Sequence, residues 1–285
     1  MTKVPVIPFR VPEAVLCAVT GFPVSHSRSP FIHRAFAEQF GLPLQYERVE
    51  ARPGQLSTTL DRLHELGCKG VNVTVPLKEE AAALAAEASM AVQTTGAANT
   101  LWWNAEGGLC ADNTDGVGLV RDLTRNWGMC LSGQRLAILG AGGAAAGVIP
   151  PLFAADVAEI VLINRSQARA EALVERFRSL GTLSTLQPAA HATTPVDLII
   201  NATSAGLAGD TPTFPTGLLG PSTHCYDMFY STSLTPFLAA CRARSVCADL
   251  RDGMGMLVEQ AAAAFAIWHG LQPDTTAVLS ALRGR

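Results

Sequence analysis

The sequence predicts an α/β protein with a doubly wound parallel sheet, and two features of the chain carry that prediction. Short apolar segments alternate with helical segments along almost the whole sequence, which is the pattern of parallel sheets covered by helices. One apolar segment is followed directly by a glycine-rich turn and then by a further helix. The length of 285 residues indicates two domains or one large one.

The composition argues against several classes of protein. Only 16% of the residues are charged and the formal net charge is −3, so we expect no nucleic-acid partner and no membrane partner. Seven cysteines without a Cys-x-x-Cys pair predict reduced, mostly buried thiols, and six histidines without ligand spacing predict no metal site. The thiols, and an N-terminus without an apolar signal core, favour a cytoplasmic protein.

Lysine is rare in this chain. Of the 21 basic residues, only Lys3, Lys69 and Lys78 are lysines, and the other 18 are arginines. A coding bias towards arginine explains the ratio most simply. Each remaining lysine still raises the question of what arginine could not do at its position.

The first part of the chain alternates strands and helices, which predicts a mixed or parallel sheet. Ser29 and Pro30 have the residue types of an N-cap and a first helical position, and Gly41 ends that helix. Gly107 and Gly108 separate two short apolar segments and predict a hairpin. The expected strands are 15–19, 44–49, 70–75, 101–103 and 109–110, and the expected helices are 29–40, 56–66 and 79–88.

The second part repeats strand and helix in the order of a doubly wound sheet. We expect strands at 135–139, 160–163, 197–200 and 226–230, and helices at 116–127, 167–180, 236–244, 254–268 and 275–282. Residues 136–155 carry no charge and are long enough to span a bilayer. Because they contain several glycines, they predict a strand, a turn and a helix instead, which Pro150 and Pro151 should kink or end early.

The glycine turn has the sequence Gly140-Ala-Gly-Gly-Ala-Ala, which fits the G-x-G-x-x-A motif of dinucleotide-binding Rossmann domains. Gly140 allows a tight turn, and Gly142 lets a pyrophosphate approach the backbone at the helix N-terminus. The expected strand before the turn and helix after it are the context that the motif requires. The alternative is a plain strand-to-helix turn.

The end of the following strand indicates which dinucleotide is bound. An NAD site places an acidic residue about 20 residues after the glycines, where it binds the ribose hydroxyls. Here the strand ends in Asn164-Arg165-Ser166, and Arg169 follows one turn later. Guanidinium groups bind phosphate well, so we expect NADP. The alternative is an ordinary helix start with solvated arginines.

The segment from Asn72 to Lys78 carries candidate substrate and catalytic residues. Strand alternation places Asn72 and Thr74 on one face. Lys78 lies near a helix start, where a cation is mildly disfavoured, and lysine can give up its proton whereas arginine effectively cannot. Lys78 is therefore a candidate for acid–base chemistry. The alternative is a surface lysine beside Glu79 and Glu80.

Two further loops contain candidates. Asp115 precedes a helix and is either an N-cap or turn residue, or a carboxylate that pairs with Lys78. Ser27 and Ser29 flank Arg28, and their hydroxyls could hold a polyol, although Ser29 could serve only as the helix cap.

These residues together resemble the shikimate dehydrogenase family over nearly the whole chain. The resemblance lies in nine segments in this order: 21–30, 70–80, 96–100, 112–118, 140–147, 164–165, 201–204, 226–230 and 253–260. It implies reversible reduction of 3-dehydroshikimate to shikimate by NADPH in the shikimate pathway of aromatic amino-acid and chorismate biosynthesis. It also implies an N-terminal α/β substrate domain, residues 1–114 and 253–285, and a doubly wound Rossmann NADP-binding domain, residues 115–252.

The resemblance also implies a role for individual residues. Lys78 and Asp115 would be the catalytic pair, and no metal would be needed. The substrate would be held by Ser27 and Ser29 at its carboxylate, and elsewhere by Asn72, Thr74, Asn99, Asp115 and Gln260, with Tyr230 nearby. The cofactor would contact Gly140, Gly142, Gly143 and Ala144 in the phosphate loop, Asn164, Arg165, Ser166 and Arg169 at the adenosine phosphate, and Thr203, Met228, Gly253 and Met256 towards the nicotinamide.

The chain departs from the family pattern in the glycine loop. Ala145 and Ala146 stand where many relatives have Ser-Arg, which removes one cation from the phosphate side. Two alternatives stay open, namely a paralogue acting on quinate or an aminoshikimate, and a non-catalytic NADP-binding regulator. The sequence leaves open whether the protein is a monomer or a homodimer, and how strongly it prefers NADP to NAD.

Overall fold

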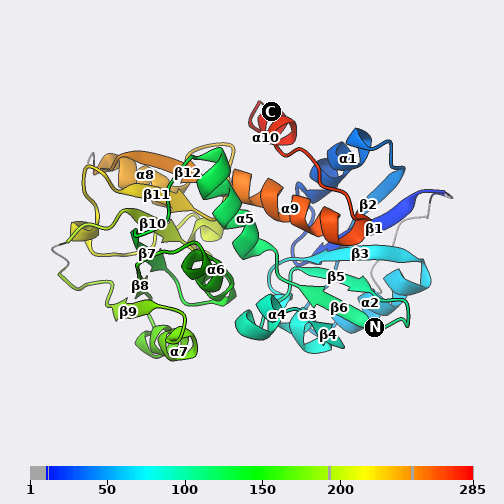
Figure 1. The fold of residues 1–285 in the computed structure, drawn as a ribbon, viewed down its shortest axis with the longest axis horizontal. Coiled ribbons are helices and arrows are strands. Elements are labelled where there is room, and N and C mark those ends of the chain that lie inside the picture. Colours follow the sequence, from blue (N-terminus) through cyan, green and yellow to red (C-terminus); the bar gives the residue numbers. More distant parts are fainter. Residues whose placement is uncertain (1–10, 12, 192–193, 245–246, 285) are drawn as a thin grey trace. The chain divides into compact units, whose positions relative to one another are not determined.

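The computed structural model describes residues 11, 13–191, 194–244 and 247–284 (Figure 1). The chain forms two compact units, the first made of Met1–Thr114 with Val258–Arg285 and the second of Asp115–Leu257. The chain passes from the first unit to the second after Thr114, where the sequence placed the domain boundary. Residues 253–257, which were expected in the first unit, group with the second. The substrate and cofactor roles of the two units stay predictions at this point.

The first unit is built on a six-stranded mixed sheet of order β2-β1-β3-β5-β6-β4. The strands are β1 (Val15–Gly21), β2 (Leu44–Glu50), β3 (Cys68–Val73), β4 (Glu87–Ala88), β5 (Thr100–Trp103) and β6 (Leu109–Asp112). β1 runs parallel to β2 and β3, while β5 is antiparallel to both β3 and β6. The predicted mixed sheet and hairpin are therefore confirmed.

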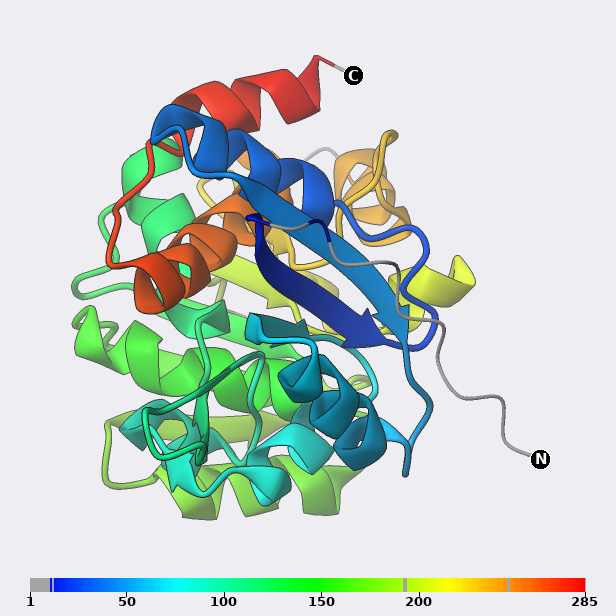
Figure 2. The same cartoon turned by 90° about the vertical axis from the view of Figure 1, so that its right-hand side faces the viewer.

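Helices cover both faces of this sheet (Figure 2). They are α1 (Ser29–Gln39), α2 (Leu56–Glu65), α3 (Lys78–Leu84), α4 (Met90–Thr95), α9 (Met254–His269), which contains the unit boundary, and α10 (Thr276–Arg283). Because side chains alternate along β1, Leu16 and Ala18 pack in the core that includes α2, while Cys17 and Val19 pack against the α9 residues Ala264 and Trp268.

The second unit contains six parallel strands in the order β12-β11-β10-β7-β8-β9. These are β7 (Arg135–Leu139), β8 (Glu159–Ile163), β9 (Thr182–Leu186), β10 (Leu198–Asn201), β11 (His224–Asp227) and β12 (Asp249–Asp252). Counted within the unit, this is the 3-2-1-4-5-6 order of a Rossmann sheet, so the predicted doubly wound fold is confirmed.

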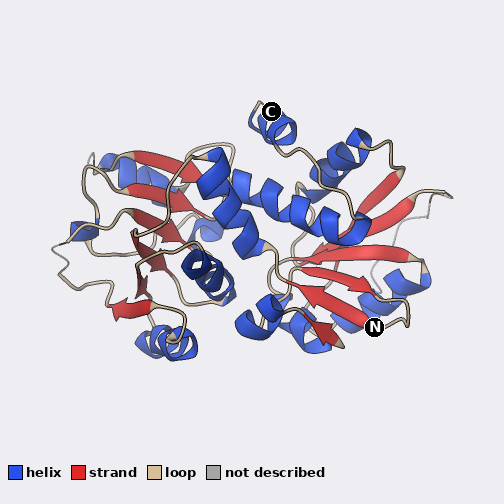
Figure 3. Cartoon of the chain, viewed as in Figure 1, coloured by secondary structure: helices blue, strands red, loops and turns tan. Residues whose placement is uncertain are grey.

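Helices again lie on both faces of the second sheet (Figure 3). One core joins it to α5 (Asp115–Arg121), α6 (Gly143–Ala154) and α7 (Gln167–Phe177), and a second joins it to α8 (Pro236–Ala243). α5 continues as a π-helical turn, Asp122–Asn126, and 3₁₀ turns occupy Ala205–Ala208 and Thr216–Leu218. The uncharged run 136–155 is β7, the glycine turn and α6. Within the described ranges, no helix is long and apolar enough to cross a membrane.

Some expected details are wrong. Arg28, not Ser29, occupies the N-cap position of α1, because the Ser29 hydroxyl lies within the helix and bonds to Ser27. Asp115 is the first residue of α5. The expected helix 79–88 ends at Leu84, because the next residues form β4 and pair with β6.

Pro150 and Pro151 do not end α6, which continues to Ala154. The buried residues around the two prolines favour the continued helix. Proline at 151 removes the N–H that would bond to the Gly147 carbonyl. Gly116 of α5 lies directly over that carbonyl and the Pro151 ring, and a side chain there would overlap both. The close packing of α5 on α6 thus accommodates the interrupted helix.

Candidate active site

The carboxyl end of β3 carries the first predicted residues. Asn72 is buried near the end of the strand, where Tyr46 of β2 donates a hydrogen bond of 2.6 Å to its amide oxygen. Thr74 follows the strand, and its backbone N–H bonds to the Thr20 carbonyl at the end of β1. Lys78 is the first residue of α3, and its carbonyl accepts a bond from the Ala98 N–H. The turn between β3 and α3 is therefore fixed to both neighbouring segments.

A buried polar cluster adjoins this turn. The Asn72 amide donates to the Asn99 carbonyl at 3.2 Å, and the Asn99 side chain exchanges bonds with Thr114 at 2.9 and 3.0 Å. The Asn99 amide also donates to Gln260 of α9 at 3.3 Å. Three predicted substrate residues from distant parts of the sequence thus lie in one network in the first unit. Asp115, also buried, directly follows Thr114 and begins the second unit.

Ser27 and Ser29 lie together at the start of α1. Their hydroxyls are 3.2 Å apart, and the Ser27 hydroxyl also accepts the Ser29 backbone N–H. The Arg48 guanidinium holds the loop by two bonds to the Ser27 carbonyl, at 2.6 and 3.0 Å. The pair presents hydroxyl groups, which suit a carboxylate or a polyol.

Tyr46 is a residue that the sequence reasoning missed. Its buried hydroxyl donates to the Asn72 amide oxygen at 2.6 Å, so it joins β2 to the polar cluster. Burial is the main cause that raises the pKa of Tyr46 well above its usual value, which keeps the phenol protonated as a donor. The alternation of the strand 44–50, which points Tyr46 and Arg48 to one face, is a signal that could have identified it.

The glycine turn of the second unit has the geometry that an anion needs. Gly140 has φ +112°, which favours glycine, and its N–H bonds to the Ile163 carbonyl at 2.8 Å. Gly142 precedes α6 with no side-chain cap, and the space around its Cα is open. The first N–H groups of α6, from Gly143 and Ala144 onwards, therefore have no capping side chain and can bind phosphate. Ala145 and Ala146 are buried in the core.

The predicted adenosine phosphate residues follow β8. Arg165 and Arg169 are exposed, and neither guanidinium group forms a hydrogen bond or ion pair with another described residue. The Asn164 amide donates to the Ser166 carbonyl at 2.9 Å, which shapes the turn into α7. Ser166 occupies the N-cap position without a side-chain bond. Two guanidinium groups are thus available to a phosphate here.

The nicotinamide-side residues lie at the carboxyl ends of β10, β11 and β12. Asn201 and Asp227 are register partners there, and the Thr203 hydroxyl donates to the Asn201 side chain at 2.7 Å. The Met228 N–H bonds to the Asn201 carbonyl, and the Gly253 N–H bonds to the Phe229 carbonyl. Met228 packs in the same core as the buried Met256, and the Tyr230 ring stacks on Phe229. The structure thus brings Thr203, Met228, Gly253, Met256 and Tyr230 to one edge of the second sheet.

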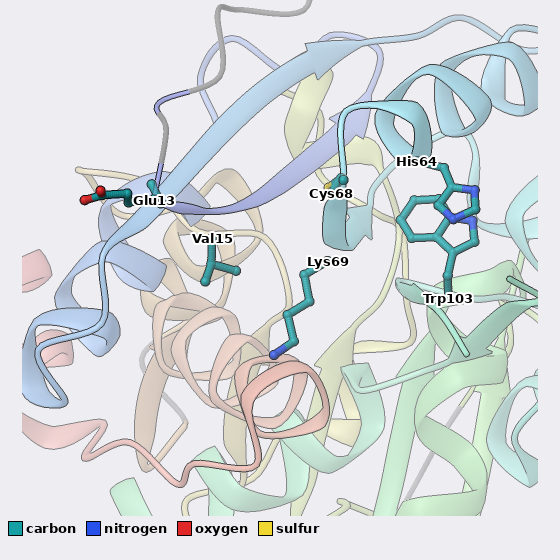
Figure 4. A pocket seen from close by; sticks show the side chains of 8 residues that line it. Glu13, Val15, His64, Cys68, Lys69 and Trp103 are labelled. Carbon is teal, nitrogen blue, oxygen red and sulfur yellow. The ribbon is translucent and has the colours of Figure 1, made fainter. Parts of the chain in front are cut away.

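A cavity of about 560 Å³ lies at the opposite end of the first sheet (Figure 4). Val15 and Lys69, at the amino ends of β1 and β3, line it together with His64, whose ring stacks on Trp103 at 4.8 Å. None of the predicted site residues borders this cavity. Among the described residues, no group of His, Cys, Asp or Glu side chains could hold a metal ion. All seven cysteines are free thiols, and five of them are buried.

Three family models match the chain. The shikimate dehydrogenase substrate binding domain matches residues 19–101, shikimate/quinate 5-dehydrogenase matches residues 122–208, and the shikimate 5′-dehydrogenase C-terminal domain matches residues 253–283. A shikimate dehydrogenase (NADP(+)) of Alkalilimnicola ehrlichii is 47% identical over 266 residues, which cover 93% of this chain and 97% of that protein.

Solved structures are similar over the same length. Shikimate 5-dehydrogenase of Thermus thermophilus, crystallised with NADP(H) and shikimate, superimposes with a TM-score of 0.82 at 33% identity and covers 95% of this chain and 99% of that one. An Ael1 enzyme of Pseudomonas putida gives a TM-score of 0.88 at 39% identity, covering 94% of this chain and 98% of that one.

Proposed function

The chain belongs to the shikimate dehydrogenase family, and we propose that it catalyses the NADP-dependent, reversible reduction of 3-dehydroshikimate to shikimate. The observation that carries this proposal is the buried network of Asn72, Asn99 and Gln260 beside the turn that bears Lys78. Such a set of amides and hydroxyls matches a substrate with several hydroxyl groups. We place the protein in the cytoplasm and in aromatic amino-acid biosynthesis.

Lys78 supplies the proton in this mechanism. As the substrate carbonyl becomes an alcohol, negative charge grows on its oxygen, and a positioned ammonium group stabilises that charge and then donates its proton. In the reverse direction the neutral amine accepts the proton. Asp115 is the carboxylate assigned to act with Lys78. Ser27 and Ser29 orient the substrate through its carboxylate.

The residues of the second unit fit NADP. NADPH supplies the hydride when it is bound. The open space at Gly142 and the uncapped start of α6 suit the pyrophosphate, and the exposed Arg165 and Arg169 suit a 2′-phosphate. The chain has no acid at the end of β8 that would repel this phosphate, because Asn164 occupies the position.

The proposal is tested by the formation of reduced cofactor, measured at 340 nm with shikimate or quinate, each with NADP⁺ or NAD⁺. We expect the highest kcat/KM for shikimate with NADP⁺. Activity only with quinate and NAD⁺ would assign the chain to a paralogue with another substrate. Binding of NADP⁺ without turnover of any pair would indicate a non-catalytic regulator.

A further inference from the structure

A buried carboxylate, Asp227, lies at the carboxyl ends of β10 and β11 and has no part in the mechanism above. Its side chain is fully buried, as are those of Asn201 and Thr235. The Asn201 amide donates to one carboxylate oxygen at 2.9 Å, and the Phe229 N–H donates to the same oxygen at 3.1 Å. The Thr235 hydroxyl donates to the other oxygen at 2.6 Å. Every neighbour with a hydrogen bond to this carboxylate is therefore a donor.

The carboxylate sets the direction of the hydrogen bonds beyond it. An ionised carboxylate can only accept, so the Asn201 NH₂ group must face Asp227 and the Asn201 oxygen must face away from it. That oxygen accepts from the Thr203 hydroxyl at 2.7 Å and from the Thr203 N–H at 3.1 Å. The hydroxyl proton of Thr203 is consequently directed inward. Its oxygen accepts the Ala205 N–H at 3.4 Å, and one lone pair and a methyl group remain for a ligand.

We propose that Asp227 is a positioning residue that acts through Asn201 and holds the half-buried Thr203 hydroxyl as a hydrogen-bond acceptor for an N–H or O–H group of the cofactor. The inference rests on the proposed function in one respect, namely that the cofactor binds against Thr203. It assigns a chemical requirement to this contact, because the group that meets Thr203 must be a donor.

The same carboxylate fixes the loops after both strands. Thr235 is the N-cap of α8 and accepts the Leu238 N–H, so its bond to Asp227 joins the start of α8 to β11. The Phe229 N–H is held directly, and the Phe229 carbonyl in turn accepts the Gly253 N–H at 3.2 Å. Asp227 therefore also holds the start of α8 and the loop after β11, and asparagine in its place could still bond to the Phe229 N–H and the Thr235 hydroxyl.

The ionisation of Asp227 is within reach of ordinary pH. Burial raises the pKa of its carboxyl to about 6, while the bonds from Thr235, Phe229 and Asn201 counteract that rise. The charged and titratable groups that face it are Asp252 of β12, which raises the pKa further, and the Cys241 thiol of α8. Below this pH the carboxyl group carries a proton, which has to be donated although its three partners, Asn201, Phe229 and Thr235, already donate to it. The arrangement at Thr203 therefore requires the ionised form.

The test replaces Asp227 by asparagine and measures the Kd for NADP⁺ at pH 8, together with the KM for shikimate and the midpoint of thermal unfolding. The asparagine oxygen still accepts from Asn201 and Phe229, because the Phe229 and Thr203 N–H groups can only donate, but without its charge it holds the Asn201 amide less firmly. We expect Asp227→Asn to raise the Kd for NADP⁺ about tenfold, with the KM for shikimate changed less than twofold.

Two comparisons separate positioning from simple stability. Asp197→Asn makes the same change at the other end of β10, where Asp197 accepts the Arg135 N–H, and should leave the Kd for NADP⁺ within twofold. In a Thr203→Val background, Asp227→Asn should change the Kd less than threefold, because its route to the cofactor is gone. Thr203→Ser keeps the hydroxyl and should bind NADP⁺ more tightly than Thr203→Val.

An Asp227→Asn protein that melts earlier but binds NADP⁺ like the wild type would overturn the proposal. So would an equal change in Kd with and without the Thr203 hydroxyl, or a wild-type protein that does not bind NADP⁺. A wild-type protein that binds NADP⁺ but does not oxidise shikimate would contradict the proposed function alone, since the Kd comparison could still be made.

Discussion

Single residues of the first unit are held by buried hydrogen bonds and ring contacts. Tyr46 donates a hydrogen bond to Asn72, and its ring stacks on His33 at 4.4 Å. Trp268 belongs to the same aromatic group, and its ring stacks on His33 at 5.3 Å. The polar site therefore has a packed aromatic support, which restricts the rotamers of the residues that would contact a substrate.

His33 makes the stability of the protein depend on pH. It is fully buried, neither ring nitrogen has a hydrogen-bond partner among the described residues, and burial lowers its pKa from 6.5 to about 3. In the unfolded chain His33 binds a proton below about pH 6.5, whereas in the folded chain it binds one only below about pH 3. The free energy of unfolding should therefore fall by about 1.4 kcal/mol per pH unit on acidification through this window.

Replacing His33 by leucine should remove that share of the pH dependence. Urea unfolding of His33→Leu at several pH values between 4 and 7 measures the slope, and we expect a smaller slope than in the wild type. A remaining slope is expected from His269, whose pKa burial lowers to about 4. Identical slopes for the two proteins would show that His33 is not the buried neutral group described here.

Arg165 tests the choice of cofactor at residue scale. A charge-assisted bond to phosphate is worth about 1.5–3 kcal/mol, so Arg165→Ala should raise the KM for NADP⁺ about 10- to 100-fold. The KM for NAD⁺ should not rise, because NAD⁺ lacks the 2′-phosphate. Arg176, an exposed arginine within α7, provides the matched control variant Arg176→Ala. An equal loss for both cofactors would contradict the phosphate role.

At the scale of elements, the strands and helices with strong hydrophobic periodicity were predicted from the sequence, whereas the edge strands of the two sheets were not. β9 and β12 were missed because both are edge strands without a buried alternating face, and only pairing with β8 and β11 defines them. The short β4 was also missed, because it lies in an alanine-rich segment with high helix propensity and only its pairing with β6 defines it as a strand. The secondary structure of these segments depends on pairing with distant strands, which cannot be recognised in a single sequence.

The contact between α5 and α6 can be tested directly. A methyl group at Gly116 would overlap the Pro151 ring and the Gly147 carbonyl, so Gly116→Ala should destabilise the protein by about 1–3 kcal/mol. Thermal unfolding measures the effect. Gly284→Ala, at the end of α10 where a side chain meets only ordinary contacts, is the control. A Gly116→Ala protein as stable as the wild type would show that α5 can shift on α6 without cost.

At the scale of the whole molecule, the assigned residues are divided between the two compact units. Seven of the assigned residues lie in the first unit, namely Ser27, Ser29, Asn72, Thr74, Lys78, Asn99 and Gln260, and the others, with Asp115, lie in the second. Most of them follow a strand or open a helix, which is where the motifs lie, whereas Asn72 lies within β3 and Gln260 within α9. Tyr46 and Asp227 escaped notice in the sequence, because their roles arise from hydrogen bonds between segments that are distant in the chain.

The two lysines of β3 and its following turn provide the most direct test of the central claim. Lys69 near the start of the strand and Lys78 after its end are both described, and only Lys78 is assigned to proton transfer. The measurement is kcat for shikimate oxidation with NADP⁺, followed at 340 nm in the wild type, Lys78→Ala and Lys69→Ala. We predict a loss of about 10²- to 10⁴-fold for Lys78→Ala and a change below twofold for Lys69→Ala. A loss below tenfold for Lys78→Ala, or equal losses for the two variants, would contradict the account.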